Sequence, residues 1–484
     1  MKTTDHRARR GAAARRILVA GLSLLAAVSA GAGLRARQDP APAPVPRAEA
    51  LGSLRALDDA AARGLWPGFS PAAVPLALFD GENTLLRGHP SPPAEFVPVP
   101  GQSRLLITRG RYPAVTANST RDIGGVRTAT VVPEPAASFG WNMLAVVEEA
   151  FHVFWLERHP AFRPDEMARY AYPLEDVGNL HALLAEDEAL ARAIEAASSS
   201  DAAAWAATAL GLRRARIASL DEDLRTYESA LEMMEGTANY VSRVAVGETP
   251  AQTAERLRRA RPVDGIRWRF YDSGAALCFV LDRLSAGWKA AAEREPALTM
   301  VEQLRAALGE RPANAASFSD AELSALLAGA SSSIAGFESR RAQVRASLID
   351  RPGARIVISL TTGVEPFRIR RFDPVNLLVL RGGEVAHPHN LTIESAQGTV
   401  EVTNPGFVRG AFDGAVALSL PAGSHPLRSG VRELTLIGLS ATPAIGNDPG
   451  EVRIDGPGVS IRLRNASVST EGNVIRIEVK GTRP

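Results

Sequence analysis

The chain has 484 residues, of which 45% are hydrophobic, 22% charged and 6% aromatic, a composition typical of soluble globular proteins. This length allows two or three domains with large cores. The formal net charge is +2, but the first 30 residues carry a net charge of +5, so the chain without them has a net charge of −3. A weakly acidic chain gives no indication of a nucleic-acid partner. The single cysteine, Cys278, excludes internal disulfide bonds and cysteine-based metal sites.

The N-terminal segment has the pattern of an export signal. The basic stretch MKTTDHRARRGAAARR precedes the apolar run ILVAGLSLLAAVSAGAG, and small residues around Ala30 offer a signal-peptidase site. We therefore expect residues 1–30 to be a signal peptide and residues 31–50 a Pro/Ala linker, in a bacterial protein that is periplasmic or extracellular. If the apolar run stayed uncleaved, it would tether the protein to the membrane, because it is just long enough to span a bilayer. No later stretch has that length and character.

Residues 51–137 are predicted to form a small sheet. The short apolar runs VPLALFDG, NTLLRG, SRLLITRG and VRTATVV are broken by Gly and Pro, which is typical of strands. The next stretch is predicted to be a helix that begins near Ser138 and ends before Pro160. Helical periodicity continues, so residues 138–345 are expected to be mainly helical.

The composition changes again at residue 351, where Val, Ile, Thr, Gly and Pro become frequent in alternating patterns. Residues 351–484 are therefore expected to form an all-β domain, a sandwich or a barrel. The predicted fold class is multidomain α+β, with residues 51–345 forming one region before this domain.

An acidic pair and a histidine interrupt the apolar run AVVEEAFHVFW in the first predicted helix. Glu148 and His152 are four residues apart and share one face, and Glu149 is their neighbour. Burying them there would be unfavourable without partners. The spacing is that of His-Glu-x-x-His, in which two histidines bind zinc and the glutamate activates water, with Glu148 in place of the first histidine. Taken alone, the pattern more often means two solvent-facing acids and a histidine at the edge of the core.

Two further segments resemble motifs of one enzyme family. The segment EGTANY, which begins at Glu235, has the pattern Glu-Gly-x-Ala-x-Tyr, and YDSGA, which begins at Tyr271, has the pattern Tyr-x-x-Gly-Ala. In this order, after a strand-rich segment, the three motifs resemble those of the gluzincin zinc metallopeptidases, which include the large aminopeptidase family. The resemblance covers roughly residues 70–290.

The resemblance implies a gluzincin-like catalytic region and a role for each matching residue. It implies that His152 and Glu235 are metal ligands, that Glu149 is the general base, and that Tyr271 donates a hydrogen bond to the oxyanion. Glu148 occupies a ligand position with a different side chain. The gap between His152 and Glu235 is longer than in the aminopeptidases, so a helical insertion is expected there. The implied function is an exported, metal-dependent hydrolase of peptide or related amide bonds, with zinc as the expected metal.

The glutamate in place of a histidine leaves alternatives open. A carboxylate can bind zinc at about 2.0–2.2 Å, so a site can persist. Two carboxylates neutralise a dication, however, which acidifies bound water less, and oxygen ligands shift the preference towards manganese or calcium. Alternatively no metal binds, and the chain is a catalytically impaired binding or scaffold protein of the cell envelope. A third interpretation is an unrelated helical envelope protein. The sequence does not specify the substrate or the oligomeric state.

Other polar residues have simpler interpretations. Glu235 would be an ordinary exposed acid if Glu228, Glu232 and Glu235 formed one solvated helix face, and Tyr271 could serve packing alone. A glycosidase is discounted, because adjacent acids on one helix cannot flank a glycosidic bond from opposite sides. The remaining histidines considered are expected in loops, at a helix end or on a helix without a spaced partner: His89, His159, His181, His387 and His389.

Overall fold

The computed structural model describes residues 44–61, 63–132, 139–166, 168–259, 261, 263–309, 315–350, 352–372, 378–380, 384–387, 391–402, 415–419, 430–439, 445–448, 450–456 and 458–481. The predicted signal peptide and most of the predicted linker lie outside these residues. Among the described residues, none of the helices combines the length and the apolar character needed to cross a bilayer.

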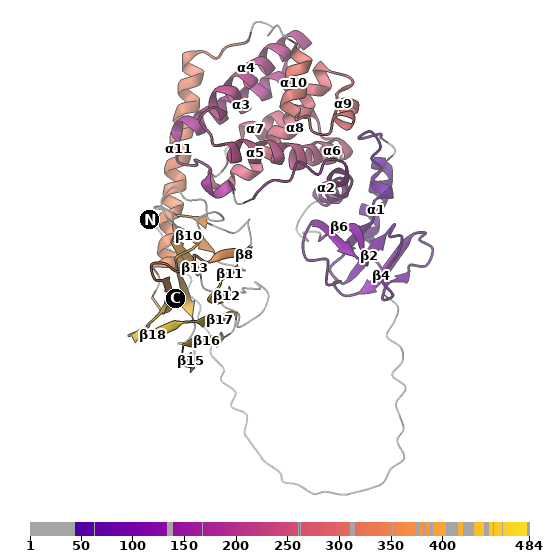
Figure 1. The fold of residues 1–484 in the computed structure, drawn as a ribbon. Coiled ribbons are helices and arrows are strands. Elements are labelled where there is room, and N and C mark those ends of the chain that lie inside the picture. The colour runs from indigo at the N-terminus through magenta and orange to yellow at the C-terminus, as the bar shows by residue number, and fades with distance from the viewer. Residues whose placement is uncertain are drawn as a thin grey trace, which may run out of the picture. The chain divides into compact units, whose positions relative to one another are not determined.

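A six-stranded sheet forms the first part of the described chain (Figure 1). Its strands are β1 (Leu76–Phe79), β2 (Asn83–Arg87), β3 (Val97–Pro98), β4 (Leu105–Arg109), β5 (Ser119–Ile123) and β6 (Val126–Val131), in the order β3-β4-β2-β1-β6-β5. Neighbours are antiparallel except β1 and β6, which are parallel. Both faces are covered, since Leu76 and Leu78 enter the main core while Ala77 enters a smaller cluster. The predicted sheet is present, with β3 and β5 as additional edge strands.

A helix that the sequence analysis did not predict precedes this sheet. Helix α1 (Ala48–Ala61) spans the end of the predicted linker and the start of the predicted strand-rich segment. Its buried Ala50, Leu54 and Leu57 recur at i, i+4 and i+7, the spacing of one helix face. A short 3₁₀ turn, Pro71–Ala73, follows before β1.

Helix α2 (Phe139–Arg158) matches the predicted helix in position. It packs through Val146, Val147, Phe151 and Trp155 into the same core as the sheet. Glu148, Glu149 and His152 lie between these apolar positions on the same helix.

The following part of the chain is helical, as expected. Its α-helices are α3 (Val177–Glu195), α4 (Ser199–Ile217), α5 (Glu222–Leu231), α6 (Thr237–Ala245), α7 (Pro250–Arg258), α8 (Ile266–Leu284), α9 (Trp288–Arg294), α10 (Met300–Leu308) and α11 (Asp320–Val344). Short 3₁₀ turns lie at Ala168–Ala171 and Val263–Gly265, and π-helical turns at Glu232–Gly236 and Arg345–Ile349. Capping boxes begin α10 and α11, where Thr299 pairs with Glu302 and Ser319 with Glu322.

The insertion expected between His152 and Glu235 is formed mainly by α3 and α4, which pack side by side (Figure 1). Helix α5, the π-turn Glu232–Gly236 and α6 then run on as one continuous helical segment.

Two glycines allow this segment to touch α8 backbone to backbone. A Cβ placed on Gly236 would lie 2.5 Å from the Cα of Gly274, and a Cβ on Gly274 would lie 2.6 Å from the carbonyl oxygen of Glu232. No side chain fits at such distances. The glycines of the EGTANY and YDSGA segments therefore serve the same helix crossing, which sets Glu235 beside Tyr271.

We predict that Gly236→Ala lowers the free energy of unfolding by about 2–3 kcal/mol, because the added methyl group must push two backbones apart. Gly211→Ala is the matched control. Gly211 also lies in a helix, α4, and its Cβ would meet nothing within 4 Å. This control should leave the stability unchanged or raise it by up to about 1 kcal/mol. Urea denaturation measures both, and equal effects would contradict the proposed role of the glycine contact.

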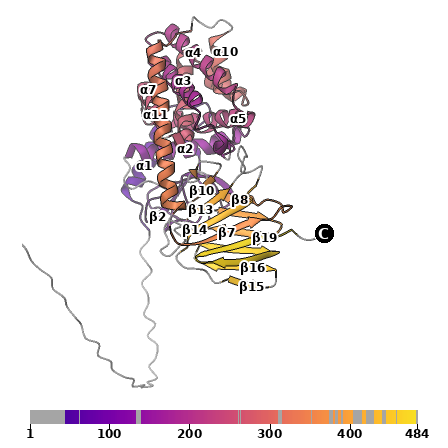
Figure 2. The ribbon, with the colours of Figure 1, turned by 90° about the vertical axis from the view of Figure 1, so that its left-hand side faces the viewer.

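The C-terminal region is a β-sandwich (Figure 2). Its strands are β7 (Ala354–Leu360), β8 (Arg368–Phe372), β9 (Leu378–Val379), β10 (Glu384–His387), β11 (Leu391–Ser395), β12 (Gly398–Val402), β13 (Ala415–Ser419), β14 (Glu433–Leu439), β15 (Ile445–Asp448), β16 (Glu451–Gly456), β17 (Val459–Arg464), β18 (Ala466–Glu471) and β19 (Val474–Val479). One sheet has the order β18-β19-β7-β14-β13-β10-β9 and the other β15-β16-β17-β12-β11-β8.

The sandwich forms because its strands alternate buried and exposed residues. In β19, Ile475, Ile477 and Val479 are buried and share a core with Ile454 and Ile461 of the other sheet. All pairings are antiparallel except that of β7 with β19, which is parallel. The expected all-β character of this region is confirmed.

Candidate metal centre

Helix α2, the segment from the π-turn to α6, helix α8 and strand β5 border one cleft of about 600 Å³. The five residues singled out from the sequence motifs all line it: Glu148, Glu149, His152, Glu235 and Tyr271. They come from three separate helical segments, so their meeting is a property of the fold and not of sequence proximity.

Glu148, His152 and Glu235 form the closest group in the cleft. Each offers one ligand atom, and these atoms lie within 4.8 Å of one another. The Nε2 atom of His152 lies 3.0 Å from Oε2 of Glu235. His152 and Glu235 are buried and Glu148 is half-buried, so the alternative of solvated surface acids does not hold for this group.

The group fits a metal ion in donor type and spacing. Two ligands about 2.1 Å from one ion lie about 3.4 Å apart at a tetrahedral angle, so a pair at the 4.8 Å limit would have to close by about 1.4 Å. The Nδ1 atom of His152 is buried without a hydrogen-bond partner among the described residues. The ring is therefore not held by a second hydrogen bond and can adjust towards an ion. One imidazole and two carboxylates suit several divalent metals and do not single out zinc.

The protonation of this group follows from its burial. Burial raises the pKa of Glu148 to about 8, because the carboxylate loses hydration. For His152, burial opposes the charged form, but Glu235 and the other two acids outweigh it and raise the pKa to about 9. Burial also acts on Glu235, whose pKa is nevertheless lowered to about 2 by His152 and Arg267. The metal-free centre thus contains a His152–Glu235 ion pair beside an uncharged Glu148.

Glu149 lies beside this group but is not part of it. Burial raises its pKa to about 7, with the charge of His152 acting in the opposite sense. A carboxylate whose pKa lies near neutral pH can both accept and return a proton under physiological conditions. Its position in the cleft and its pKa agree with the role that the resemblance implies.

Tyr271 is tied to Glu235 through Arg267, a residue that the sequence analysis did not single out. Arg267 donates hydrogen bonds to Oε1 of Glu235 at 2.8 Å, to the carboxylate of Glu166 at 3.0 Å, and to the hydroxyl of Tyr271. Burial raises the pKa of Tyr271 well above its ordinary value, so the hydroxyl keeps its proton. Arg267 lies one helical turn before Tyr271, and this i, i+4 spacing was the available signal.

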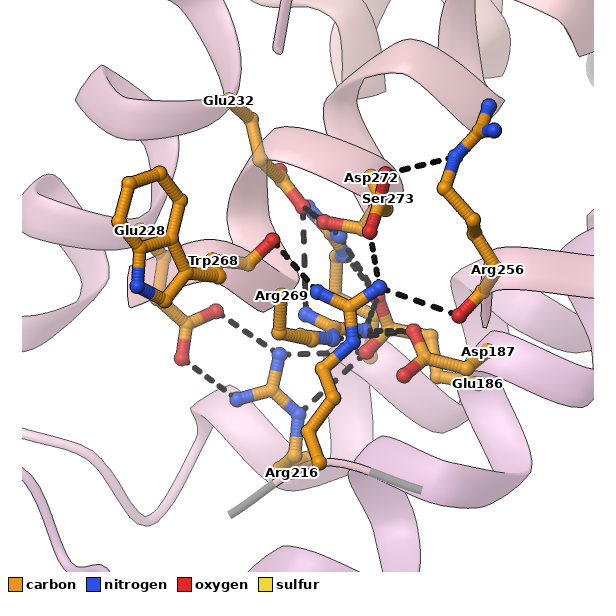
Figure 3. A network of polar contacts seen from close by, with 12 residues as sticks. Glu186, Asp187, Arg216, Glu228, Glu232, Arg256, Trp268, Arg269, Asp272 and Ser273 are labelled. Carbon is orange, nitrogen blue, oxygen red and sulfur yellow. Dashed lines mark hydrogen bonds and ion pairs between the residues drawn. The ribbon is translucent and has the colours of Figure 1, made fainter. Parts of the chain in front are cut away.

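The π-turn explains why Glu235 faces the cleft. In a regular helix Glu228, Glu232 and Glu235 would share one face, but Glu235 lies inside the π-turn Glu232–Gly236, where the wider turn changes the direction of its side chain relative to the preceding helix. Glu228 and Glu232 bind arginines behind the cleft (Figure 3). Glu235 contacts His152 instead. All three are buried, so the interpretation as an exposed acidic face was wrong.

Behind the cleft lies a buried network of charged side chains, here called the ionic core. Its members are Glu186, Asp187, Arg213, Arg216, Glu228, Glu232 and Arg269. Arg216 bridges Glu186 at 3.1 Å and Glu228 at 2.6 Å (Figure 3). Arg269 of α8 contacts Glu186 at 2.9 Å and Asp187 at 2.8 Å.

The ionic core fastens the inserted helices to the segment that carries Glu235. Arg213 of α4 binds Glu232 at 2.5 Å, and the hydroxyl of Ser273 donates to the same carboxylate at 2.5 Å. Because Glu232 lies three residues before Glu235, this network fixes the π-turn from behind. The sequence analysis missed it, since partners from four helical segments cannot be paired by spacing alone.

Of the other histidines considered, those whose side chains the structure describes, His89, His159 and His181, do not line the cleft. The Nε2 atom of His89 forms a hydrogen bond with the carbonyl oxygen of Ile123 at 2.9 Å. His159 stacks on Trp155 with ring centroids 3.7 Å apart. His181 lies on α3. His387 ends β10, while His389 lies outside the described residues.

Comparison of the chain with protein-family models, with curated proteins and with solved structures finds no match. The resemblance to gluzincins therefore rests on the three sequence motifs. The structure adds the buried Glu148–His152–Glu235 group, which could hold a metal ion.

The metal-free protein should lose stability as pH rises from about 5 to about 9. The pKa values of Glu148, Glu149 and His152 are raised from 4.5, 4.5 and 6.5 to about 8, 7 and 9. A raised pKa stabilises the fold below the unfolded-state value, and this contribution disappears as pH passes the folded-state value. The lowered pKa of Glu235 acts only at more acidic pH, below its ordinary value of 4.5.

Thermal denaturation in the presence of a chelator tests this expectation. The melting temperatures of wild type and Glu148→Gln are compared at each pH, so that the contributions of titrating groups common to both proteins cancel in the difference. The melting temperature of wild type should fall relative to the variant as pH rises. Added zinc or manganese should then stabilise wild type more at high pH than at low pH, because ligands must lose protons to bind a metal. A difference between the two proteins that does not change with pH would contradict the assigned protonation states.

Proposed function

We propose that this chain is an exported, metal-dependent hydrolase that acts on peptide or related amide bonds. The observation that carries the proposal is the buried Glu148–His152–Glu235 group in one cleft with Glu149. Glu148, His152 and Glu235 would hold the ion. When bound, the ion supplies Lewis acidity towards a carbonyl oxygen and lowers the pKa of water. Export is proposed on the N-terminal sequence pattern alone.

Glu149 is the proposed general base. Its carboxylate accepts a proton from the attacking water and returns it to the leaving nitrogen, so one residue serves both halves of hydrolysis. A pKa of about 7 suits both transfers, because neither protonation state is strongly favoured at neutral pH.

Tyr271 and Arg267 are the proposed stabilisers of the oxyanion. The Tyr271 hydroxyl keeps its proton, and Arg267 adds a positive charge beside it. Such groups act where negative charge develops on the substrate, and their fixed positions avoid reorganisation during the reaction. Arg267 is itself held by Glu166 and Glu235, so its direction is set before substrate binds.

The edge strand β5 favours an extended peptide as substrate. β5 is the last strand in the sheet order, and Asn118, Ser119 and Thr120 line the cleft. Its backbone pairs with β6 on one side. An extended chain placed along the other side could add to the sheet by backbone hydrogen bonds, a common mode of peptide recognition.

A second candidate function is peptide binding without catalysis. The specific observation that favours it is that the centre satisfies its own charges without an ion. One carboxylate oxygen of Glu235 accepts a hydrogen bond from Arg267, and the other forms an ion pair with His152. A metal has to compete with the His152–Glu235 ion pair, and Glu148 is a weaker match for zinc than a histidine.

If the proposal is correct, Glu149→Gln should reduce peptide hydrolysis by about a hundredfold or more, because the amide cannot accept a proton. Bound metal should remain, since Glu149 is not assigned coordination. Glu157→Gln is the matched control, because Glu157 also lies on α2 but is exposed and outside the cleft. A peptide-substrate screen and metal analysis of the purified proteins measure both effects. Equal activity of the two variants would contradict the assignment of Glu149.

Glu148→His should increase zinc affinity by at least about tenfold, because imidazole suits zinc better than a carboxylate and one negative charge is removed. Hydrolysis should rise with it, since a more positive centre acidifies water more strongly. Zinc titration against a competing chelator measures the affinity. No gain in affinity would mean that His152 and Glu235 are not ligands. A gain in affinity without any activity would favour the binding protein.

A further inference from the structure

Three arginines converge on two acids beside the metal centre. This arginine cluster consists of Arg243 of α6, Arg256 of α7 and Arg261, with Glu248 and Asp272 as its acids. Arg243 lies 2.7 Å from Glu248 and 3.4 Å from Asp272. Arg256 lies 3.3 Å from Asp272, also contacts Glu248, and is drawn with Asp272 in Figure 3. Arg261 contacts Asp272 as well.

Within the cluster three guanidinium groups share two carboxylates, and two acids outside it, Glu148 and Asp187, act on Arg243 and Arg261. Burial and the charge of Arg243 lower the pKa of Arg256 to about 10, although Asp272 acts in the opposite sense. The nearby Arg259 adds no compensation, since it is a further cation, paired with Glu255 at 3.6 Å.

The arginine cluster faces the cleft of the metal centre. Arg243, Arg261 and Asp272 line the cleft. The side chains of Arg243 and Arg261 are only 10% and 23% exposed, so water screens them weakly. Glu148 is the cleft acid whose charge reaches Arg243, and the proposed function assigns that charge to the metal.

The position of Arg243 sets the distance to the centre. Glu235, Asn239 and Arg243 all line the cleft, at i, i+4 and i+8 of one helical segment. Eight residues at 1.5 Å each separate Glu235 from Arg243 by roughly 12 Å along the helix. An extended peptide covers about 3.3 Å per residue, so this distance corresponds to roughly two to four residues.

We propose that the arginine cluster binds a carboxylate of the substrate and so selects peptides that carry one about two to four residues from the hydrolysed bond. This inference rests on the proposed function for the bond that is cleaved. Guanidinium groups bind carboxylates with paired, charge-assisted hydrogen bonds. The carboxylate can come from the C-terminus of a peptide or from an Asp or Glu side chain, and the two sources present the same chemistry.

The test is a binding experiment, which does not depend on turnover. The full chain with Glu149→Gln, loaded with zinc, is titrated in a calorimeter with three peptides. These are acetyl-tetra-alanine as the free acid, the same peptide as its C-terminal amide, and the amide with one alanine replaced by glutamate. Either or both carboxylate peptides should bind about tenfold tighter than the plain amide, as expected for one charge-assisted contact.

Variants then assign the preference to the cluster. Arg261→Gln should reduce the advantage of the preferred peptide to within about twofold, and Arg261→Lys should restore part of it, because charge is retained while the forked geometry is lost. Arg259→Gln is the matched control, since it removes the same charge from a neighbouring residue outside the cleft. It should leave the preference unchanged.

The outcomes separate this inference from the proposed function. A preference for the free acid identifies a C-terminal carboxylate, and a preference for the glutamate peptide identifies a side chain. The inference is overturned if the Glu149→Gln protein with an intact cluster binds all three peptides equally or binds none of them. This outcome does not depend on any variant of the cluster. A preference that survives Arg261→Gln in folded protein also overturns it. Carboxylate preference without hydrolysis by the wild type would leave the inference standing and remove the hydrolase.

Discussion

The arrangement of the cleft depends on the contact between Gly236 and Gly274. It brings two helix backbones so close that no side chain fits between them. Glu235 immediately precedes Gly236, and Tyr271 lies three residues before Gly274 on the same helix, so the contact sets the distance between a proposed metal ligand and a proposed oxyanion donor. Because a backbone contact has no rotamers, it positions both groups more rigidly than side-chain packing would.

The ionic core acts on the same segment from the other side. Isolated ion pairs in the interior seldom stabilise a fold, since both charges lose their hydration, yet removing one partner leaves an uncompensated charge and is strongly destabilising. In this protein Glu186 contacts Arg213, Arg216 and Arg269, and its pKa is held well below its ordinary value despite burial. Such a network tolerates few alternative arrangements. It therefore fixes the register between the inserted helices and the π-turn.

The sequence predicted those elements whose signal is local. Periodicity located α2, and alternation located the C-terminal sandwich, because one buried face suffices to produce each pattern. Strand β5 was missed because an edge strand beside a cleft is polar and lacks that alternation, as its residues Ser119 to Ile123 show. Helix α1 was missed because a Pro/Ala-rich stretch precedes it.

The candidate site was only partly predictable for a related reason. The motifs identified Glu148, Glu149, His152 and Glu235. A motif specifies residue types and spacing, but it does not specify which residues elsewhere in the chain contact them. Arg267 acts through contacts to residues distant in the sequence. The π-turn leaves no compositional trace, because it differs from an α-helix only by one residue in a turn.

The acids of the cleft lie so close together that an ion could take the place of the protons they hold. Three acids and a histidine share a small, partly buried space, and in the metal-free state Glu148 keeps its proton near neutral pH while Glu149 is only partly protonated. Native folds seldom retain buried acids in this condition unless a function requires them. A divalent cation would convert mutual repulsion into ligation, and the protonated Glu148 would become a ligand. The His152–Glu235 ion pair then represents the metal-free form of the same centre, in which the imidazolium supplies the positive charge that the ion would bring.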